Sequence, residues 1–301
     1  MSYRYCTADV FTNVAFGGNQ LAVLPDARGL SDAQMQNITR EFNYSETAFV
    51  FPPEAGGTKK LRIFTPGSEI PFAGHPTVGS AHVLAAIGEI KLTGAETQIV
   101  FEEGVGPISV TIRAEGSNPV FAQLSVAKLP EVGPQPPTRT TLAEILSLDA
   151  SDIVGGTTPP QALSCGLPFL IVPLKNRDAV ARARVKLDRW EEVMQRFWAP
   201  DIMVFAKEAE HEGHDIRARV FVPGQGISED PATGSANATL AGYLAQRDHA
   251  TEGTLRWVVE QGYEMGRPSI LEIEADKVAG QVTAIRVGGA SVMVAEGALR
   301  V

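Results

Sequence analysis

Two stretches of the chain share an unusual form. EDPATGSANATLAGYL, Glu229 to Leu244, places two acids, a proline and a Gly-Ser pair directly before a run of small and apolar residues. PFAGHPTVGSAHVLAAIG, Pro71 to Gly88, ends a polar segment in the same way, with a Gly-His pair. Each run is typical of a helix, so we expect one helix to begin near Gly74 and another near Gly234.

The sequence around these stretches repeats. RIFTPGSEIPFAGHPTVGSAHVLAAIG begins at Arg62, and RVFVPGQGISEDPATGSANATLAGYLA begins at Arg219. Both open with Arg-apolar-Phe-x-Pro-Gly, pass through a polar loop and enter a small-residue helix. Aligning Gly74 with Gly234 places His75 opposite Ser235, with a loop three residues longer in the second copy. The repeat predicts two similar lobes with a cleft between them.

The rest of the chain favours an α+β fold. Short alternating segments bounded by Gly and Pro, which are typical of strands, outnumber helical segments about two to one. A Pro-rich segment at 129–141 is the best candidate for a linker. We therefore expect an N-terminal lobe over 1–128, completed by a C-terminal strand at about 285–301, and a C-terminal lobe over 129–284.

Composition excludes several classes of function. The net charge is −9 and the Lys and Arg residues are scattered, which argues against a nucleic acid or an anionic membrane as partner. The N-terminal residues lack a signal-peptide core and no 18-residue apolar run occurs, so we expect a cytoplasmic protein. Cys6 and Cys165 are too few for a disulfide framework and are expected to be buried. Metal-binding motifs are absent from the sequence and its five histidines are dispersed, so no metal site is expected.

The two helix starts suggest how the protein binds a ligand. The N-terminus of a helix has unpaired N–H groups and a partial positive charge, and a glycine there lets a ligand approach the backbone. Gly74 with His75 and Gly234 with Ser235 would thus bind a small carboxylate from both lobes and stabilise negative charge in a transition state. The alternative is that His75 and Ser235 only cap their helices.

Two acids could handle protons. Asp230 precedes Pro231, which restricts its backbone to extended conformations. Glu46, in NYSETAFVF, lies where a helix gives way to an apolar strand, so its side chain could point into the cleft. A partly buried carboxylate has a raised pKa and can act as a general acid or base near neutral pH. The alternative for Glu46 is a solvated surface position.

Five segments together resemble the PhzF-like isomerase family of phenazine biosynthesis, whose fold is that of diaminopimelate epimerase. The segments extend over nearly the whole chain and follow the family's order. A single one would be a weak signal, but all five together are specific for the family. The segments are DVFTNVAFGGNQLAVL, NYSETAFVF, RIFTPGSEIPFAGHPTVGSAHVL, EDPATGSANATLAGYL and VEQGYEMGRPSILEIE. The resemblance implies two lobes, each a curved, mostly antiparallel sheet wrapped around a central helix.

The resemblance also implies roles for individual residues. The family's proton shuttle falls on Glu46, and the other catalytic positions fall on His75 and Asp230. Substrate contacts fall on Gly74, Gly234 and Ser235. Family members act without cofactor or metal on small carboxylates, and many are homodimers. Gln20 stands where the family usually has a proline, which could alter a turn near the cleft but removes no proton-handling group.

Three functions remain open on the sequence. The first is a cofactor-independent isomerase similar to trans-2,3-dihydro-3-hydroxyanthranilate isomerase. The second is an epimerase, racemase or dehydratase of the same fold, although thiol-based racemases carry a Cys before each helix, where this chain has Ala73 and Thr233. The third is a protein that binds a small metabolite without catalysis. The sequence does not identify the substrate.

Overall fold

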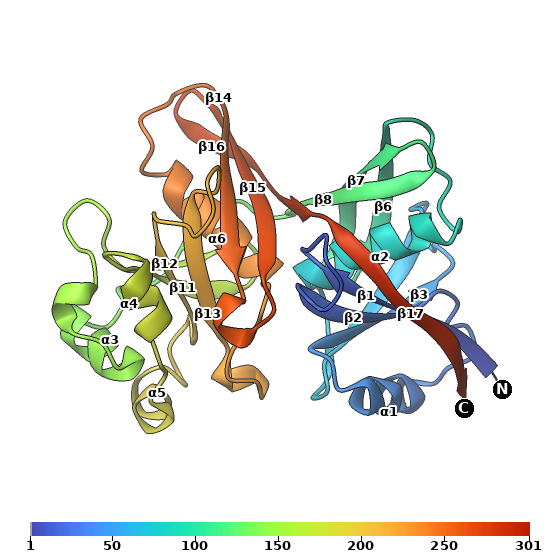
Figure 1. Ribbon diagram of the computed structural model, residues 1–301, viewed down its shortest axis with the longest axis horizontal. Coiled ribbons are helices and arrows are strands. Elements are labelled where there is room, and N and C mark those ends of the chain that lie inside the picture. The colour runs from blue at the N-terminus through green and yellow to red at the C-terminus, as the bar shows by residue number, and fades with distance from the viewer. Residues whose placement is uncertain (1) are drawn as a thin grey trace. The chain divides into compact units, whose positions relative to one another are not determined.

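The computed structural model describes residues 2–301, and its chain divides into two compact units. The first unit comprises the residues up to Ala127 together with Val287–Val301, and the second comprises Lys128–Arg286. The C-terminal segment thus returns to the first unit. There β17 (Ser291–Arg300) pairs antiparallel with β1 (Ser2–Val10), so the two chain ends lie side by side (Figure 1).

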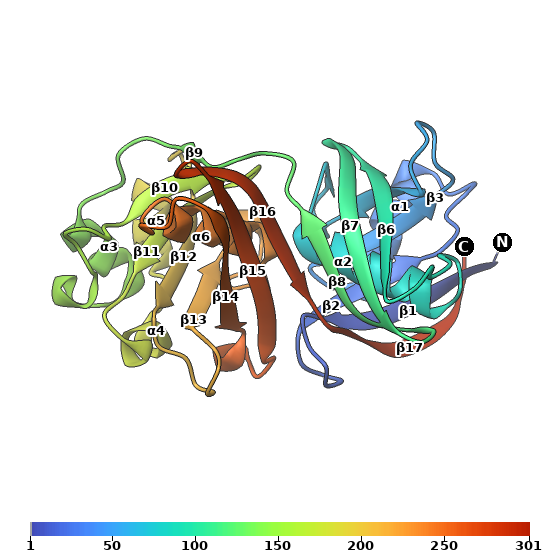
Figure 2. The same ribbon diagram turned by 90° about the horizontal axis from the view of Figure 1, so that it is seen from above.

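The first unit is a sheet wrapped around one helix. That helix, α2 (Gly74–Ala86), is buried from Gly74 to Ala85, and it contacts β1, β2, β3, β7, β8 and β17. Apart from His75 and His82, its residues are small or apolar on all sides, as suits a helix surrounded by strands. Figure 2 shows β6, β7 and β8 side by side across it. The remaining elements of this unit are β2 (Asn19–Leu24), α1 (Asp32–Phe42), β3 (Glu46–Phe51), β4 (Lys59–Phe64), β5 (Glu69–Ile70), β6 (Glu96–Glu103), β7 (Gly106–Glu115) and β8 (Asn118–Ser125).

The second unit is built in the same way around α6 (Gly234–Ala245). Ten of its residues from Ala236 to Ala245 are buried, and it contacts β10, β11, β14 and β15. A smaller layer of helices packs with Trp190 and Met194 into a separate apolar cluster. The other elements are β9 (Glu131–Val132), α3 (Arg139–Leu146), β10 (Gln161–Ser164), β11 (Pro168–Pro173), α4 (Arg177–Arg182), α5 (Leu187–Val193), β12 (Asp201–Ala206), β13 (Ile216–Phe221), β14 (Gly253–Gln261), β15 (Ser269–Val278) and β16 (Gln281–Gly289), which continues into the first unit.

The strand pairing confirms the internal repeat. In the first unit β2 and β3 pair in parallel, β3 and β4 antiparallel, β4 and β6 in parallel, and β6 and β7 antiparallel. In the second unit β11, β12, β13, β14 and β15 follow the same order of parallel and antiparallel pairings. Arg62 lies opposite Phe49, and Arg219 lies opposite Val204. The chain thus has the expected α+β fold, with two copies of one unit.

Several elements differ from the sequence expectations. Helix α4 was not predicted, because its six residues are too few to show a helical period. The run LDRWEEVMQRFW at 187–198 has apolar residues at helical spacing and predicts one helix, but α5 ends at Val193. The Pro-rich segment at 129–141 lies in the second unit, within the range expected for the C-terminal lobe, but it packs there and is not a free linker, since β9 pairs with β10 and Thr138 caps α3. The run SDAQMQNITREFN at 31–43 predicts a helix capped by Ser31 and Asp32; α1 begins there, at a capping box formed by Ser31 and Gln34.

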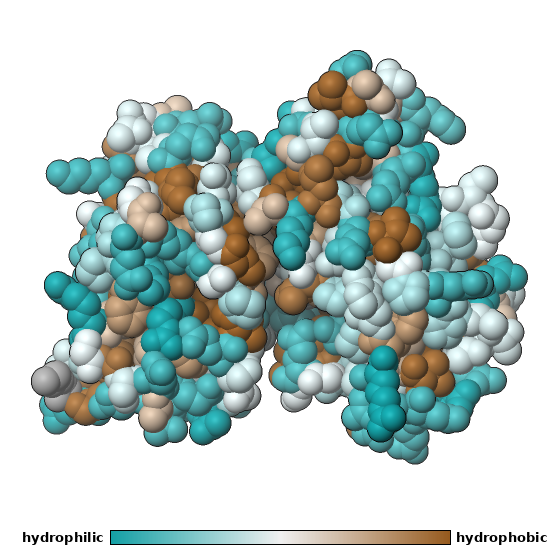
Figure 3. All heavy atoms as spheres, turned by 180° about the vertical axis from the view of Figure 1, so that it is seen from behind, coloured by the Kyte–Doolittle hydropathy of each residue, from teal (hydrophilic) through white to brown (hydrophobic). Residues whose placement is uncertain are grey.

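The surface is mixed. On the face that Figure 3 shows, hydrophilic side chains predominate and hydrophobic ones occur in small separate groups. Within residues 2–301 the structure has no helix that is long and apolar enough to cross a membrane.

Candidate functional site

Glu46 and His75 come together in the first unit. Glu46 is the first residue of β3, opposite Leu21 of β2, and His75 is the second residue of α2. Glu46 Oε2 lies 3.2 Å from His75 Nδ1, and the two side chains are only 14% and 4% exposed. Glu46 is therefore not a solvated surface acid. Its carboxyl lies at the start of the central helix.

The hydrogen bonds of His75 determine which ring nitrogen carries the proton. Nε2 lies 3.3 Å from the backbone oxygen of Gln20, which can only accept, so Nε2 is the protonated nitrogen. Burial lowers the pKa of His75 to about 3, so the ring is neutral. The single lone pair of Nδ1 then faces both the Asn19 amide, at 3.4 Å, and Glu46 Oε2, at 3.2 Å. A hydrogen bond between Glu46 and Nδ1 consequently requires a proton on Glu46.

The start of α2 has no side-chain cap. Its N-cap is Ala73, whose side chain cannot accept a hydrogen bond, and Gly74 is the first helical residue. His75 does not cap the helix, because its ring nitrogens are bonded to Gln20 and Asn19 and Nδ1 also faces Glu46. The capping alternative for His75 is therefore wrong. A backbone N–H group here can bind an anion.

Asp230 and Ser235 lie near the start of α6 in the second unit. Asp230 is 7% exposed, is bridged to Val220 of β13, and accepts a 2.5 Å hydrogen bond from the Thr233 hydroxyl. Thr233 is the N-cap of α6 without a side-chain cap bond, and Gly234 and Ser235 form the first turn. Ser235 is half-buried and is not the cap either. That the two helix starts face one cleft stays a prediction.

Sequence reasoning missed the residues that support these groups. Asn19 and Gln20 orient His75, and Gln261 binds Thr233 and the backbone oxygen of Asp230. All three supporting residues lie far along the chain from the residues they contact. For Gln261 the sequence did offer a signal. EEGV at 102–105 and EQGY at 260–263 are similar, and this similarity extends the internal repeat to Gln261.

One cluster has the side chains that a metal would need. A ring nitrogen of His211, one of His214 and an oxygen of Glu260 lie within 4.8 Å of one another, so these two histidines are not dispersed as we expected. However, the Glu260 carboxylate already accepts hydrogen bonds from the backbone of Glu210 and His211 and from Arg217. Burial raises the pKa of Glu260, but the backbone N–H groups of Glu210 and His211 and both imidazoles outweigh it and lower this pKa to about 2. The cluster therefore anchors the loop after β12 to β14.

Comparison with known proteins identifies the family. The family described as "Phenazine biosynthesis-like protein" matches residues 8–297. The chain belongs to this PhzF-like family. An uncharacterized isomerase of Mesorhizobium japonicum is 39% identical over 98% of both chains, and trans-2,3-dihydro-3-hydroxyanthranilate isomerase of Pseudomonas fluorescens is 35% identical over 99% of both. Like these PhzF-like relatives, the protein is an isomerase.

Solved structures of the PhzF family have the same fold. A PhzF-family protein of Bacillus anthracis superposes with a TM-score of 0.89, at 25% identity and over 100% of both chains. A hydroxyproline epimerase of Agrobacterium vitis superposes with a TM-score of 0.62 at 12% identity, over 99% of this chain and 92% of its own. The second likeness concerns the fold alone and places this PhzF-like chain among the diaminopimelate epimerase-like folds.

Proposed function

We propose that this isomerase moves a proton within a small carboxylate-bearing substrate, with Glu46 as the general acid and base and without a cofactor. The observation that carries the proposal is the contact of Glu46 with Nδ1 of a neutral histidine. A shuttle must exist for a time in its protonated form, between removal and return of the proton. The Nδ1 lone pair of His75 stabilises that form, while the 14% exposure of Glu46 leaves an approach for substrate.

The two helix starts bind the substrate in this proposal. The N–H groups near Gly74 and near Gly234 with Ser235 hold its carboxylate and the charge that develops when a proton leaves carbon. Asp230, fixed by Thr233, binds a polar group of the substrate. The substrate class follows from the relatives named trans-2,3-dihydro-3-hydroxyanthranilate isomerase, so that compound, a cyclic amino-carboxylate, is the first to test. The homodimer and the cytoplasmic location stay predictions.

Thiol-based racemisation has no support in the structure. Ala73 and Thr233 are the N-caps of the two central helices, where such chemistry needs thiols. Both cysteines are buried and unpaired, and burial raises the pKa of Cys165 to about 12, which keeps it protonated and unreactive. A two-base epimerase or a dehydratase of the same fold remains the second candidate. The third is a binding protein.

Turnover in deuterated buffer tests the proposal. The protein is incubated with trans-2,3-dihydro-3-hydroxyanthranilate in D2O, and product and label at carbon are followed by NMR and mass spectrometry. We expect the substrate to disappear and deuterium to appear at the carbon that receives the proton. Binding without turnover or exchange would favour the binding protein. Exchange at one carbon with inversion there would favour an epimerase.

A further inference from the structure

A second buried acid contacts the first turn of α2. Glu103, the last residue of β6, is 8% exposed, and its Oε1 lies 2.7 Å from the hydroxyl of Thr77. The same hydroxyl lies 2.7 Å from the backbone oxygen of Ala73, the N-cap of α2. The other carboxyl oxygen, Oε2, has no hydrogen-bond partner among the described residues. Glu103 thus contacts the first turn of α2 from the end of β6.

A count of hydrogens gives the protonation state of Glu103. A threonine hydroxyl has one hydrogen to donate, and the backbone oxygen of Ala73 can only accept it. An ionised Glu103 would take the Thr77 hydrogen and leave the hydroxyl oxygen 2.7 Å from the Ala73 oxygen with no hydrogen between them, although Ala73 would keep the backbone N–H of Thr77. Both short contacts of the hydroxyl are hydrogen bonds only when it donates to Ala73 and a neutral Glu103 donates to it, so the geometry favours the neutral acid.

The second unit has a neutral amide in the same place. Gln261 is the last residue of β14, the counterpart of β6, and its Oε1 accepts from Asn237 at 2.9 Å. Asn237 also donates to the backbone oxygen of Thr233, the N-cap of α6, at 3.0 Å. Asn237 is the fourth residue of α6, as Thr77 is the fourth of α2. Both units thus link a strand end to an N-cap carbonyl through one helical side chain.

The packing beside these residues supports the equivalence independently. A Cβ atom added to Gly104 would lie 2.8 Å from Cα of Pro71, and one added to Gly262 would lie 2.6 Å from the backbone oxygen of Pro231. Gly104 directly follows Glu103, and Gly262 directly follows Gln261. Each proline lies three residues before the first residue of its central helix. A carboxylic acid therefore occupies a position where the duplicate unit has an amide.

We propose that Glu103 is a positioning residue that works as a neutral acid: it donates a hydrogen bond to Thr77 and so holds the first turn of α2, as Gln261 holds that of α6. The turn carries Gly74 and His75, so the catalytic consequence rests on the proposed function. The effect of Glu103 on the first turn of α2 and on stability does not depend on the proposed function. Ionisation of Glu103 would remove the donated hydrogen bond and leave a buried carboxylate, whose desolvation the partial positive charge of the helix start offsets only in part.

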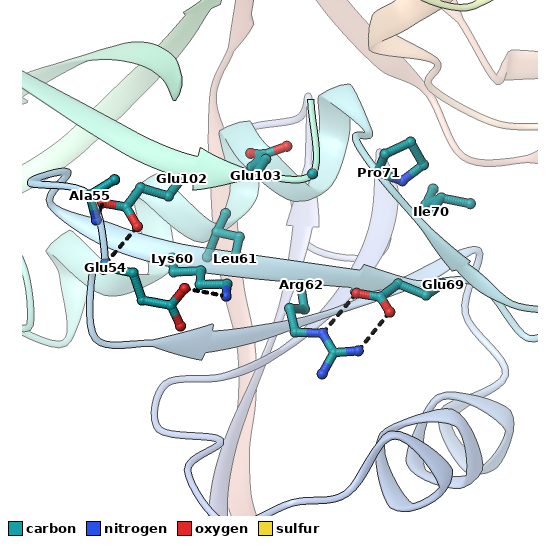
Figure 4. A pocket seen from close by; sticks show the side chains of 11 residues that line it. Glu54, Ala55, Lys60, Leu61, Arg62, Glu69, Ile70, Pro71, Glu102 and Glu103 are labelled. Atoms are coloured by element: carbon teal, nitrogen blue, oxygen red, sulfur yellow. Dashed lines mark hydrogen bonds and ion pairs between the residues drawn. The ribbon is translucent and has the colours of Figure 1, made fainter. Parts of the chain in front are cut away.

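The neighbouring charges do not compensate an ionised Glu103. Glu103 borders a surface cavity of about 670 Å³ that Lys60 and Arg62 of β4 also line. Lys60 pairs with Glu54, and Arg62 pairs with Glu69 and Asp32, while the Glu103 carboxyl points away from both cations (Figure 4). His75, in the same turn as Thr77, is neutral. Burial raises the pKa of Glu103 to about 8, which outweighs the lowering of that pKa by a hydrogen bond from Thr77 to an ionised Glu103.

The test measures the free energy of unfolding from pH 5 to pH 9 for the wild type, Glu103→Gln and Glu102→Gln. A group with a raised pKa in the folded state binds more protons folded than unfolded, so its contribution falls as pH rises from its unfolded pKa to its folded pKa. For Glu103 that window is 4.5 to about 8. Relative to Glu103→Gln, the unfolding equilibrium constant of the wild type should rise about tenfold per pH unit across this window.

Glu102→Gln is the matched control, one residue away on the same strand. Its carboxylate accepts hydrogen bonds from the backbone of Glu54, Ala55 and Gly57, which lower its pKa, so its replacement should destabilise the fold at pH 7. A pH slope in Glu103→Gln equal to that of the wild type, or a loss of stability like that of Glu102→Gln, would overturn the proposal.

A second measurement tests the catalytic part. The kcat/KM of the wild type should fall as pH rises through about 8, and Glu103→Gln should lack this decline. A loss of the stability slope together with an unchanged alkaline decline would confine Glu103 to the fold and overturn its role in positioning the site. Because the stability measurement needs no substrate, failure of the proposed function would not be mistaken for failure of this inference.

Discussion

Two acids of the first unit approach the same helical turn from different strands and have different roles in our account. Glu46 begins β3 and contacts His75, whereas Glu103 ends β6 and contacts Thr77. A shuttle must exchange its proton, so it needs both a partner that accepts the proton and an approach for substrate. A positioning acid needs neither, and the burial of Glu103, which is 8% exposed, fits a group that stays neutral.

Replacement of His75 or Asp230 by alanine should impair catalysis more than folding. His75→Ala removes the acceptor that stabilises protonated Glu46, and Asp230→Ala removes a proposed substrate contact. We expect kcat/KM to fall by about 10²-fold or more in each, in the range typical of positioned acid–base groups. Steady-state kinetics beside thermal unfolding would measure both effects.

Ser235→Ala is the control for these two variants. Ser235 is not the cap of α6, so its loss should change stability by less than the roughly 1 kcal/mol that a lost cap costs. Its backbone N–H remains available to the substrate. If His75→Ala and Asp230→Ala unfold readily while their folded fraction keeps full activity, both residues are structural.

At the scale of elements, the central helices have to fit closely inside their strands. Gly79 of α2 faces β1 and β2, and a Cβ atom added there would lie 2.5 Å from Val10 Cγ2 and 2.6 Å from Leu21 Cδ2. Alanine is intrinsically a better helix former than glycine by about 0.5–1 kcal/mol. Overpacking a dense core costs about 1–3 kcal/mol. The steric effect is therefore the larger one.

We accordingly expect Gly79→Ala to lower the free energy of unfolding, although it raises helix propensity. Urea titration would measure the change. Gly67→Ala serves as control, because Gly67 is exposed and the nearest atom to an added Cβ, Thr65 Oγ1, is at 3.7 Å. A Gly79→Ala protein as stable as the control or more stable would show that α2 tolerates more volume than the structure indicates.

At the scale of the whole molecule, the duplication explains what the sequence could predict. The two helix starts and most strands were predictable because their signals are local and occur twice in the chain. Contacts between distant segments were not, such as those of Glu103 with Thr77, 26 residues away, and of Asn19 with His75, 56 residues away. The proximity of Glu46 to His75 followed from the family resemblance and not from spacing. Helix α4 was missed because it is short.

The central claim is that Glu46 alone removes and returns the proton. Glu46→Gln keeps the shape of the side chain and its amide can still donate to His75 Nδ1, but it cannot accept a proton. The measurement is turnover and deuterium incorporation for the wild type and Glu46→Gln on the same accepted substrate, with binding and melting temperature as controls. We predict unchanged folding, retained binding, and a loss of turnover of about 10⁴-fold or more, at the upper end for acid–base groups. Retention of more than about a tenth of wild-type turnover would contradict the account, since a positioned acid–base group contributes at least about 10²-fold.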